Sequence, residues 1–169
     1  MIQKYKEFVP MIGKDSYIFA QAMLLGNIKI GKNCIIYPNA VIRGEYNEVI
    51  IGDNTNIQEN SCIHTEIGIN VNIGKNVTIG HNAIVHACTI KDNCVIGMGA
   101  IIQNGAVIEQ NCIIGAGSVV PQNMVVPEGY IAYGIPAKVI RELRKEDYDE
   151  IRESTEEYQE YRQELLKGE

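Results

Sequence analysis

The sequence predicts an all-β chain that winds into a left-handed parallel β-helix and ends in an α-helix. Three observations indicate this fold class: aliphatic residues recur every six positions, small residues follow them at a fixed interval, and glycine often comes directly after them. A period of six fits neither an α-helix nor the alternation of a simple hairpin sheet, whereas a triangular coil of three short strands requires it. Grouping the hexads in threes gives about six coils around one core.

The aliphatic positions, called anchors below, run in four series separated by short breaks. Each anchor is expected to point into the coil, and successive coils are expected to rise by about 4.8 Å. The anchors are Ile12, Ile18, Leu24, Ile30, Ile36, Ile42, Ile51, Ile57, Ile63, Ile73, Ile79, Val85, Ile90, Ile96, Ile102, Ile108, Ile114, Val120 and Val126.

Small residues four places after an anchor are expected to pack inside the next corner of the coil. Cys34, Cys94 and Cys112 share this position with several alanines and serines. No cysteine belongs to a Cys-x-x-Cys pair, so the five cysteines are expected to be reduced core thiols. Glycine or asparagine is expected where the backbone bends. Glycine directly follows an anchor at Gly13, Gly31, Gly52, Gly74, Gly80, Gly97 and Gly115.

The hexad period stops after Pro136 and divides the chain into two parts. Residues 1–136 are expected to form the β-helix domain, and residues 137–169 a C-terminal extension that packs on it. Within the extension, a charged segment from about Lys145 to Lys167 carries apolar and aromatic residues at helical spacing. This stripe is expected to face the coil. It consists of Tyr148, Ile151, Tyr158, Tyr161 and Leu165.

Composition limits the possible partners. The chain has 169 residues, 46% apolar content and a net charge of -6. This acidic balance argues against nucleic acid as a partner, because phosphate binding requires a basic stripe. No stretch reaches the roughly 18 apolar residues that a membrane span needs, and the first residues lack the apolar run of a signal peptide. The composition therefore predicts a cytoplasmic protein with no membrane partner.

The histidines lie at equivalent or neighbouring positions of the repeat. Arg43, His64 and His86 each follow the anchor that begins the third side of a coil. They are expected to stack on one edge, with the two imidazoles close enough to share a metal ion. His81 belongs to the second side and is expected to face away from that pair. A neighbouring chain related by a three-fold axis would supply its own His81, so the pattern predicts a homotrimer with a shared metal site.

Two breaks in the hexad series, at residues 45–48 and 66–70, follow third-side segments. Loops are expected to emerge there beside the histidine edge, where a scaffold places substrate-facing groups. Surface insertions without a function explain the same breaks equally well. Cys62 and Cys88 lie near the histidines and are minor candidates for a redox or ligand role.

Four segments carry a family resemblance, which runs from about Tyr17 through Lys138. The segments Arg43-Gly44-Glu45, Ile51-Gly52-Asp53-Asn54-Thr55-Asn56-Ile57-Gln58-Glu59, His64 and Ile79-Gly80-His81-Asn82-Ala83-Ile84-Val85-His86 resemble the gamma-class carbonic anhydrases. The resemblance implies that three histidines hold Zn²⁺, or another divalent metal such as Fe²⁺ or Co²⁺, across a trimer interface. His64, His81 and His86 match those three ligands.

The resemblance also implies roles for three residues around the metal. Gln58 would hydrogen-bond the metal-bound water or bicarbonate, while Arg43 and Glu45 would form an ion pair at the subunit interface. The chain departs from the family pattern at Glu45, where aspartate is usual. It also has only a short segment with Glu66 in place of the acidic proton-shuttle loop, and residues 154–158 lack the asparagine that the family pattern places near Glu157.

Three functions follow as alternatives. In the first, metal-bound hydroxide attacks carbon dioxide and yields bicarbonate at the subunit interfaces of the homotrimer. In the second, the chain is a hexapeptide acyltransferase that uses acyl-CoA and a histidine as general base, and residues 134–138 resemble the coenzyme-binding turn of such enzymes. In the third, the trimer binds metal without catalysis. The histidine triad favours the first, because acyl transfer does not require it.

Overall fold

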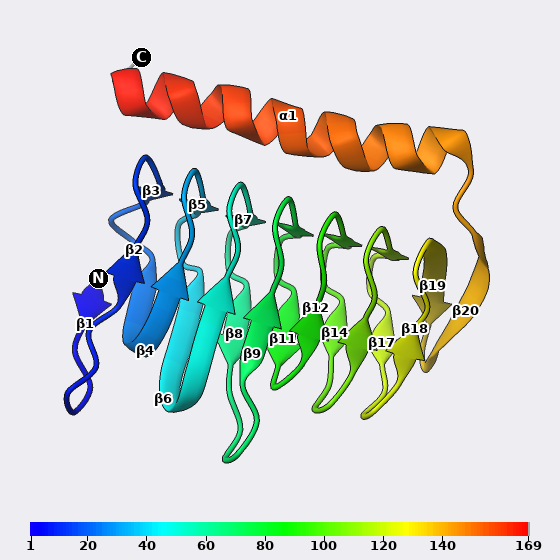
Figure 1. Cartoon of the computed structure of the whole chain (residues 1–169), viewed down its shortest axis with the longest axis horizontal. Coiled ribbons are helices and arrows are strands. Elements are labelled where there is room, and N and C mark those ends of the chain that lie inside the picture. Colours follow the sequence, from blue (N-terminus) through cyan, green and yellow to red (C-terminus); the bar gives the residue numbers. More distant parts are fainter. Residues whose placement is uncertain (169) are drawn as a thin grey trace.

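The computed structural model describes residues 1–168, and Glu169, the last residue of the expected C-terminal extension, lies outside them. Short parallel strands stack coil upon coil, and one long helix lies along the stack (Figure 1). The parallel β-helix with a C-terminal helix that the sequence predicts is therefore confirmed. Within the described range, no helix is long and apolar enough to cross a membrane.

The strands form three columns, one for each side of a triangular coil, and neighbours in a column are parallel except for β19 and β20. β4 (Met23–Ile30) and β6 (Val41–Ile51) turn a corner, so each gives its first half to the third side and its second half to the first. The third side also contains β1 (Ile2–Gln3), β8 (Cys62–His64), β11 (Ile84–His86), β14 (Ile101–Ile102) and β17 (Val119–Val120). The first side also contains β2 (Met11–Ile12), β9 (Val71–Ile73), β12 (Thr89–Ile90), β15 (Val107–Ile108) and β18 (Val125–Val126). The second side contains β3 (Tyr17–Ile18), β5 (Ile35–Ile36), β7 (Asn56–Ile57), β10 (Thr78–Ile79), β13 (Val95–Ile96), β16 (Ile113–Ile114), β19 (Tyr130–Gly134) and β20 (Ala137–Glu142).

The anchors form a single core inside the prism. All of them are buried except Ile12 and Ile18, which belong to the first coil. The five cysteines are free, as expected, and four of them are buried. Burial raises the pKa of Cys34 to about 11 and that of Cys88 to about 12, so both thiols stay protonated at neutral pH.

Asparagine makes most of the bends at the corners. Asn33, Asn54 and Asn76 have positive φ, and their side-chain amides donate from coil to coil at 3.1 and 3.0 Å. The glycines that follow anchors have no positive φ, so the expectation that they serve the bend was wrong. A Cβ at Gly52 would lie 2.5 Å from the backbone carbon of Gly74. These glycines instead let the backbones of neighbouring coils approach.

Of the two expected loops beside the histidine edge, one is absent. β6 runs unbroken from Val41 to Ile51, so residues 45–48 remain in the strand and the expectation of a loop there was wrong. The extra residues are absorbed by an irregularity in the pairing of β4 with β6, between Gly26 and Ile28. The second break does form a projecting turn, between β8 and β9, which Glu66 and Ile69 close by backbone hydrogen bonds of 3.0 and 3.3 Å (Figure 1).

The C-terminal extension begins as part of the sheet. β20 pairs antiparallel with β19 and so continues the second side beyond the last parallel strand. α1 (Lys145–Lys167) then runs back over the coils toward β3, and its bounds are those expected from the sequence (Figure 1).

Several contacts between α1 and the coils are polar. Ser154 Oγ is 3.3 Å from Thr78 Oγ1, and Arg162 donates to the backbone oxygen of Asp15 at 2.7 Å. Only Ile151 and Arg162 of the helix are buried. The expected apolar stripe is therefore only partly covered, and Tyr148 and Tyr161 remain 44% and 41% exposed.

Alanine substitutions at an inward and an outward position of the same strand should differ in how much they lower the stability of the fold. Ile108→Ala should lower the free energy of unfolding by about 2–5 kcal/mol, because Ile108 is fully buried in the core and its truncation leaves a cavity. Val107→Ala, on the outer face of the same strand, is the matched control and should cost less than about 1 kcal/mol. Urea denaturation at a fixed protein concentration measures both. Equal costs would contradict the assignment of inward and outward faces.

Candidate metal centre

His64 and His86 lie directly above one another on the third side. β8 ends at His64 and β11 at His86, and the parallel pairing of these strands places the two residues in register. Arg43 pairs with His64 in the same way, one coil earlier. His64 Nδ1 and His86 Nε2 are 3.1 Å apart. The stacking that the hexad period predicts is confirmed.

The second nitrogen of each ring faces an oxygen atom. His64 Nε2 lies 3.3 Å from Glu45 Oε1, and His86 Nδ1 lies 2.7 Å from Asn104 Oδ1. These oxygens accept hydrogen bonds, so they favour a proton on the outer nitrogen of each ring. Unshared electron pairs then remain on the two inner nitrogens, which face each other. Two nitrogens bound to one tetrahedral zinc at about 2.0–2.1 Å would be about 3.3 Å apart, so this pair has a spacing suited to a shared metal ion.

Glu45 is the most enclosed charged group beside this pair. Its side chain is 10% exposed, and its Oε1 contacts both Arg43 Nη1 and His64 Nε2. Its other oxygen, Oε2, is buried and has no hydrogen-bond partner among residues 1–168. Burial lowers the pKa of His64, and the nearby Arg43 lowers it further, while the Glu45 carboxylate opposes both effects. The imidazole of His64 is therefore held in its neutral form, which is the form that binds metals.

His81 lies apart from this pair, in the turn between β10 and β11. Its Nδ1 is 2.6 Å from Glu59 Oε2, which favours a proton on Nδ1 and leaves the electron pair of Nε2 available. The side chain of His81 is 43% exposed. In the part of the chain that the structure describes, no three His, Cys, Asp or Glu side chains form a group that could hold a metal ion. One chain by itself therefore presents two of the three histidines at one point.

Gln58 connects His81 to α1. Gln58 Oε1 accepts a hydrogen bond of 3.1 Å from the backbone N–H of His81. Its Nε2 donates to Asn56 Oδ1 at 3.3 Å and to Tyr158 Oη at 2.5 Å. Asn56 in turn donates to Thr78 Oγ1 at 2.9 Å. Both hydrogens of the Gln58 amide are thus already used by protein groups.

A cavity of about 440 Å³ lies on the second side beside His81. His81, Gln58 and Tyr158 line its polar part. Apolar residues and glycine backbone of the following coils line the rest, among them Val95, Ile96, Met98, Ile113, Ile114 and Gly115. The cavity therefore joins one candidate metal ligand to an apolar surface.

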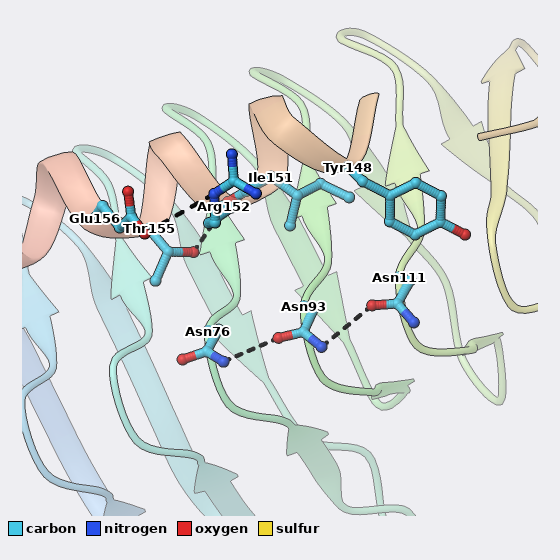
Figure 2. Close-up of a pocket in the computed structure, with 8 residues that line it drawn as sticks. All are labelled: Asn76, Asn93, Asn111, Tyr148, Ile151, Arg152, Thr155 and Glu156. Atoms are coloured by element: carbon cyan, nitrogen blue, oxygen red, sulfur yellow. Dashed lines mark hydrogen bonds and ion pairs between the residues drawn. The ribbon is translucent and has the colours of Figure 1, made fainter. Parts of the chain in front are cut away.

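A second cavity, of about 350 Å³, lies beneath α1 (Figure 2). On its coil side, Asn76 donates to Asn93 at 2.9 Å and Asn93 donates to Asn111 at 3.2 Å. On its helix side, Arg152 pairs with Asp149 at 2.9 Å. These polar groups pair with one another, and none of the three histidines lines the cavity. We interpret it as a packing gap between helix and coil.

The sequence did not single out Glu59, Asn104 or Tyr158 as site residues. For Glu59 the sequence did carry a signal, which is its position in the repeat. Glu59 and His81 each follow their anchor by two residues, in consecutive coils, so their side chains stack. Asn104 had none, and for Tyr158 the only hint was that its helical segment departs from the family pattern. Asn104 is not at the position of His86 in its hexad, and Tyr158 reaches Gln58 from 100 positions away along the chain.

Comparisons with known proteins agree on the repeat. The model of the family described as bacterial transferase hexapeptide (six repeats) matches residues 10–44 and 87–122. A curated relative, gamma carbonic anhydrase 2, mitochondrial, of Arabidopsis thaliana, is 39% identical over 55 residues. That match covers 32% of this chain but only 20% of the relative.

Two solved structures match over nearly the whole length. One, described as a putative acetyltransferase of Bacillus cereus, has a TM-score of 0.97 and 38% identity, and the match covers 100% of this chain and 98% of the other. The second, a hexapeptide transferase family protein from Anaplasma phagocytophilum, has a TM-score of 0.93 and 34% identity, and the match covers 96% of each chain. Both resemble this chain in sequence as well as in fold.

The environment of His64 predicts its titration. In metal-free protein its pKa should lie below the ordinary value of 6.5, because burial and Arg43 disfavour the charged ring. Glu45→Gln should lower this pKa further by removing the one opposing charge. Long-range ¹H–¹⁵N NMR spectra recorded against pH measure both.

The lowered pKa of His64 also makes the stability of the fold depend on pH. The unfolded chain takes up this proton at a higher pH than the folded chain, so the native state should lose stability as the pH falls below about 6.5. A His64 midpoint at or above 6.5, or a rise in Glu45→Gln, would contradict the electrostatics described above.

Proposed function

We propose a metal-dependent function for this chain, which belongs to the hexapeptide-repeat family as a gamma-carbonic-anhydrase-like member. The proposed reaction is the hydration of carbon dioxide to bicarbonate in a homotrimer that holds Zn²⁺, Fe²⁺ or Co²⁺. A mitochondrial relative bears the name gamma carbonic anhydrase, but the match covers a small part of it, so the activity is proposed here on the site itself.

One observation carries the proposal: each of the three histidines has one ring nitrogen within hydrogen-bond distance of a side-chain oxygen. Glu45 faces His64, Asn104 faces His86 and Glu59 faces His81. Metal-binding histidines typically use the second nitrogen in this way, because the outer contact fixes both the tautomer and the ring orientation. The three remaining nitrogens are then all in the form that binds a metal.

The metal site would be completed by a second copy of the chain. His64 and His86 would bind from one subunit and His81 from its neighbour, since His81 does not join the pair within one chain. When bound, the metal supplies Lewis acidity, which lowers the pKa of a water molecule to about 7. Glu45, Asn104 and Glu59 hold the imidazoles in orientation.

Arg43 and Glu45 would support the subunit interface. They contact each other, and the buried Oε2 of Glu45 lacks a partner in the described part of the single chain. A group from the adjoining subunit would supply that partner, as expected where a charge is buried at an interface. This assignment agrees with the role that the family resemblance implies.

Acyl transfer is the second candidate, favoured by the cavity beside His81. Its volume of about 440 Å³ and its apolar lining exceed what carbon dioxide needs. The Glu59–His81 contact also has the arrangement of a general base oriented by a carboxylate. Activity assays after removal of the metal separate the two candidates. An acyltransferase would work in chelator-treated protein, whereas the proposed hydratase would lose its activity and recover it with added metal.

Mixed trimers test how the ligands divide between subunits. His64→Ala and His81→Ala should each abolish tight metal binding, because each removes one of three imidazoles. When the two variants are refolded together in equal amounts, about a quarter of the interfaces should join an intact His64 edge to an intact His81 face. Metal content by mass spectrometry and carbon dioxide hydration should recover to that extent.

The matched control is each variant refolded alone, which should stay without metal. Hetero-trimers seen by native mass spectrometry that hold no metal would show that the ligands do not divide in this way.

Arg43→Ala should weaken the trimer as well as the activity. The substitution leaves the Glu45 carboxylate beside His64 without its cation, and the loss should cost the assembly about 2 kcal/mol or more. Arg43→Lys, which keeps the charge, is the control and should dissociate less. Sedimentation over a range of protein concentrations measures the effect. If Arg43→Ala remains as trimeric as the parent and is only slow, the interface role is wrong.

A further inference from the structure

We infer that the side-chain amide of Gln103 donates a hydrogen bond to the substrate at the metal centre and so helps to determine which substrate is bound. This inference rests on the proposed function. It adds to the site a residue of the coil itself, on the third side and one coil beyond His86.

Gln103 continues the column that contains the histidine pair. His64 and His86 pair in register through β8 and β11. β11 also pairs with β14, which joins Val85 to Ile102 in the following coil. The residue after Ile102 therefore lies next to His86 on the side away from His64, and that residue is Gln103. Successive members of the column are about 4.8 Å apart, so a side chain as long as glutamine spans that step.

The side chain of Gln103 lies on the same face of the sheet as the imidazole of His86. Successive residues of a strand alternate between the two faces. Val85 and Ile102 are fully buried in the core, so the residues that directly follow them point out of the prism. Gln103 is half-buried at this surface. Its amide is therefore directed to the surface that carries the histidine pair.

The amide of Gln103 is not used within the chain. Among residues 1–168, the hydrogen bonds of Gln103 are made by its backbone. Its N–H donates to the backbone oxygen of Val120 at 3.2 Å, and its own backbone oxygen accepts from Ala106 N at 3.1 Å. Two side-chain N–H donors and one carbonyl acceptor remain available.

The two donors that the family resemblance assigns to the site have protein partners instead. Arg43, on the opposite side of the histidine pair, contacts Glu45. Both amide hydrogens of Gln58 go to other side chains of the chain, and Gln58 is only 4% exposed. An amide with both hydrogens engaged cannot also donate to a substrate oxygen. Gln103 provides the hydrogen that Gln58 has already committed.

A neutral amide suits this position chemically. Bicarbonate is an anion with oxygen acceptors, and a hydrogen bond to an anionic oxygen is stronger than one between neutral groups. The amide of Gln103 also adds no charge beside His86. A lysine there would disfavour protonation of the imidazole but would also attract any anion, whereas an amide selects for an acceptor atom at the right place.

Gln103→Leu tests the inference, because leucine is similar in width but cannot donate. Gln110→Leu is the matched control: it makes the same chemical change on another edge of the prism, where Gln110 contacts Glu128. Both variants are compared with the parent as Co²⁺-loaded protein, and the visible absorption of cobalt reports the binding of bicarbonate and of chloride. Cobalt content and trimer mass are measured separately for each protein.

The expected result is selective. Gln103→Leu should bind bicarbonate about 3- to 10-fold more weakly, the loss of one hydrogen bond. Chloride is a single atom that does not extend from the metal toward Gln103, so its affinity should stay within about 2-fold of the parent. Gln103→Glu should weaken bicarbonate at least as much, because a carboxylate repels the anion and cannot donate. Gln110→Leu should match the parent throughout.

Three results would overturn the inference. Unchanged bicarbonate affinity in Gln103→Leu would show that the amide does not touch the substrate, and would leave the proposed function intact. Equal weakening for bicarbonate and chloride would show that Gln103 acts on the metal site through His86. A parent protein that binds no cobalt would remove the proposed function and this inference together.

Discussion

The structure depends on backbone hydrogen bonds between successive coils. They keep parallel neighbours about 4.8 Å apart and in fixed register, so whatever occupies one position of the repeat lies above its equivalent. Stacked isoleucines become a continuous core, and stacked asparagines such as Asn54 and Asn76 become a ladder of amides. The same register brings His64 and His86 to a nitrogen separation of 3.1 Å, so the candidate site follows from the rule that builds the core.

This rule also limits what one chain can assemble. A column supplies ligands at equivalent positions of neighbouring coils, and two imidazoles at that spacing cover one side of a metal ion. His81 belongs to another side of the prism and pairs with Glu59 in its own column. Completing a site of three imidazoles therefore requires a second surface. In our proposal the neighbouring subunit supplies it, which would link metal binding to assembly.

The period of six predicted the features that repeat: the buried anchors, the three sides and the stacked histidines. Helical spacing predicted α1, but nothing in the sequence predicted β20, which lies between the coils and the helix. The period failed where a residue acts outside the repeat. Residues 45–48 were expected to leave the strand as a loop, but they stay in β6 as a bulge opposite Asn27. Asn104 and Tyr158 reach the site through side-chain contacts that depend on rotamers and on the path of α1, neither of which the period specifies.

The contacts of α1 suggest why a long helix is kept on a coil that already has its own core. Only Ile151 and Arg162 of α1 are buried, and Tyr158 and Tyr161 pack on Tyr37. The hydrogen bonds of α1 each make a modest net contribution of about 0.5–1.5 kcal/mol, because water can replace them. Such contacts are directional, however, and those of Ser154 and Tyr158 both join the network that includes Gln58. These directional hydrogen bonds therefore fix the position of α1 along the coils, although each contributes little to stability.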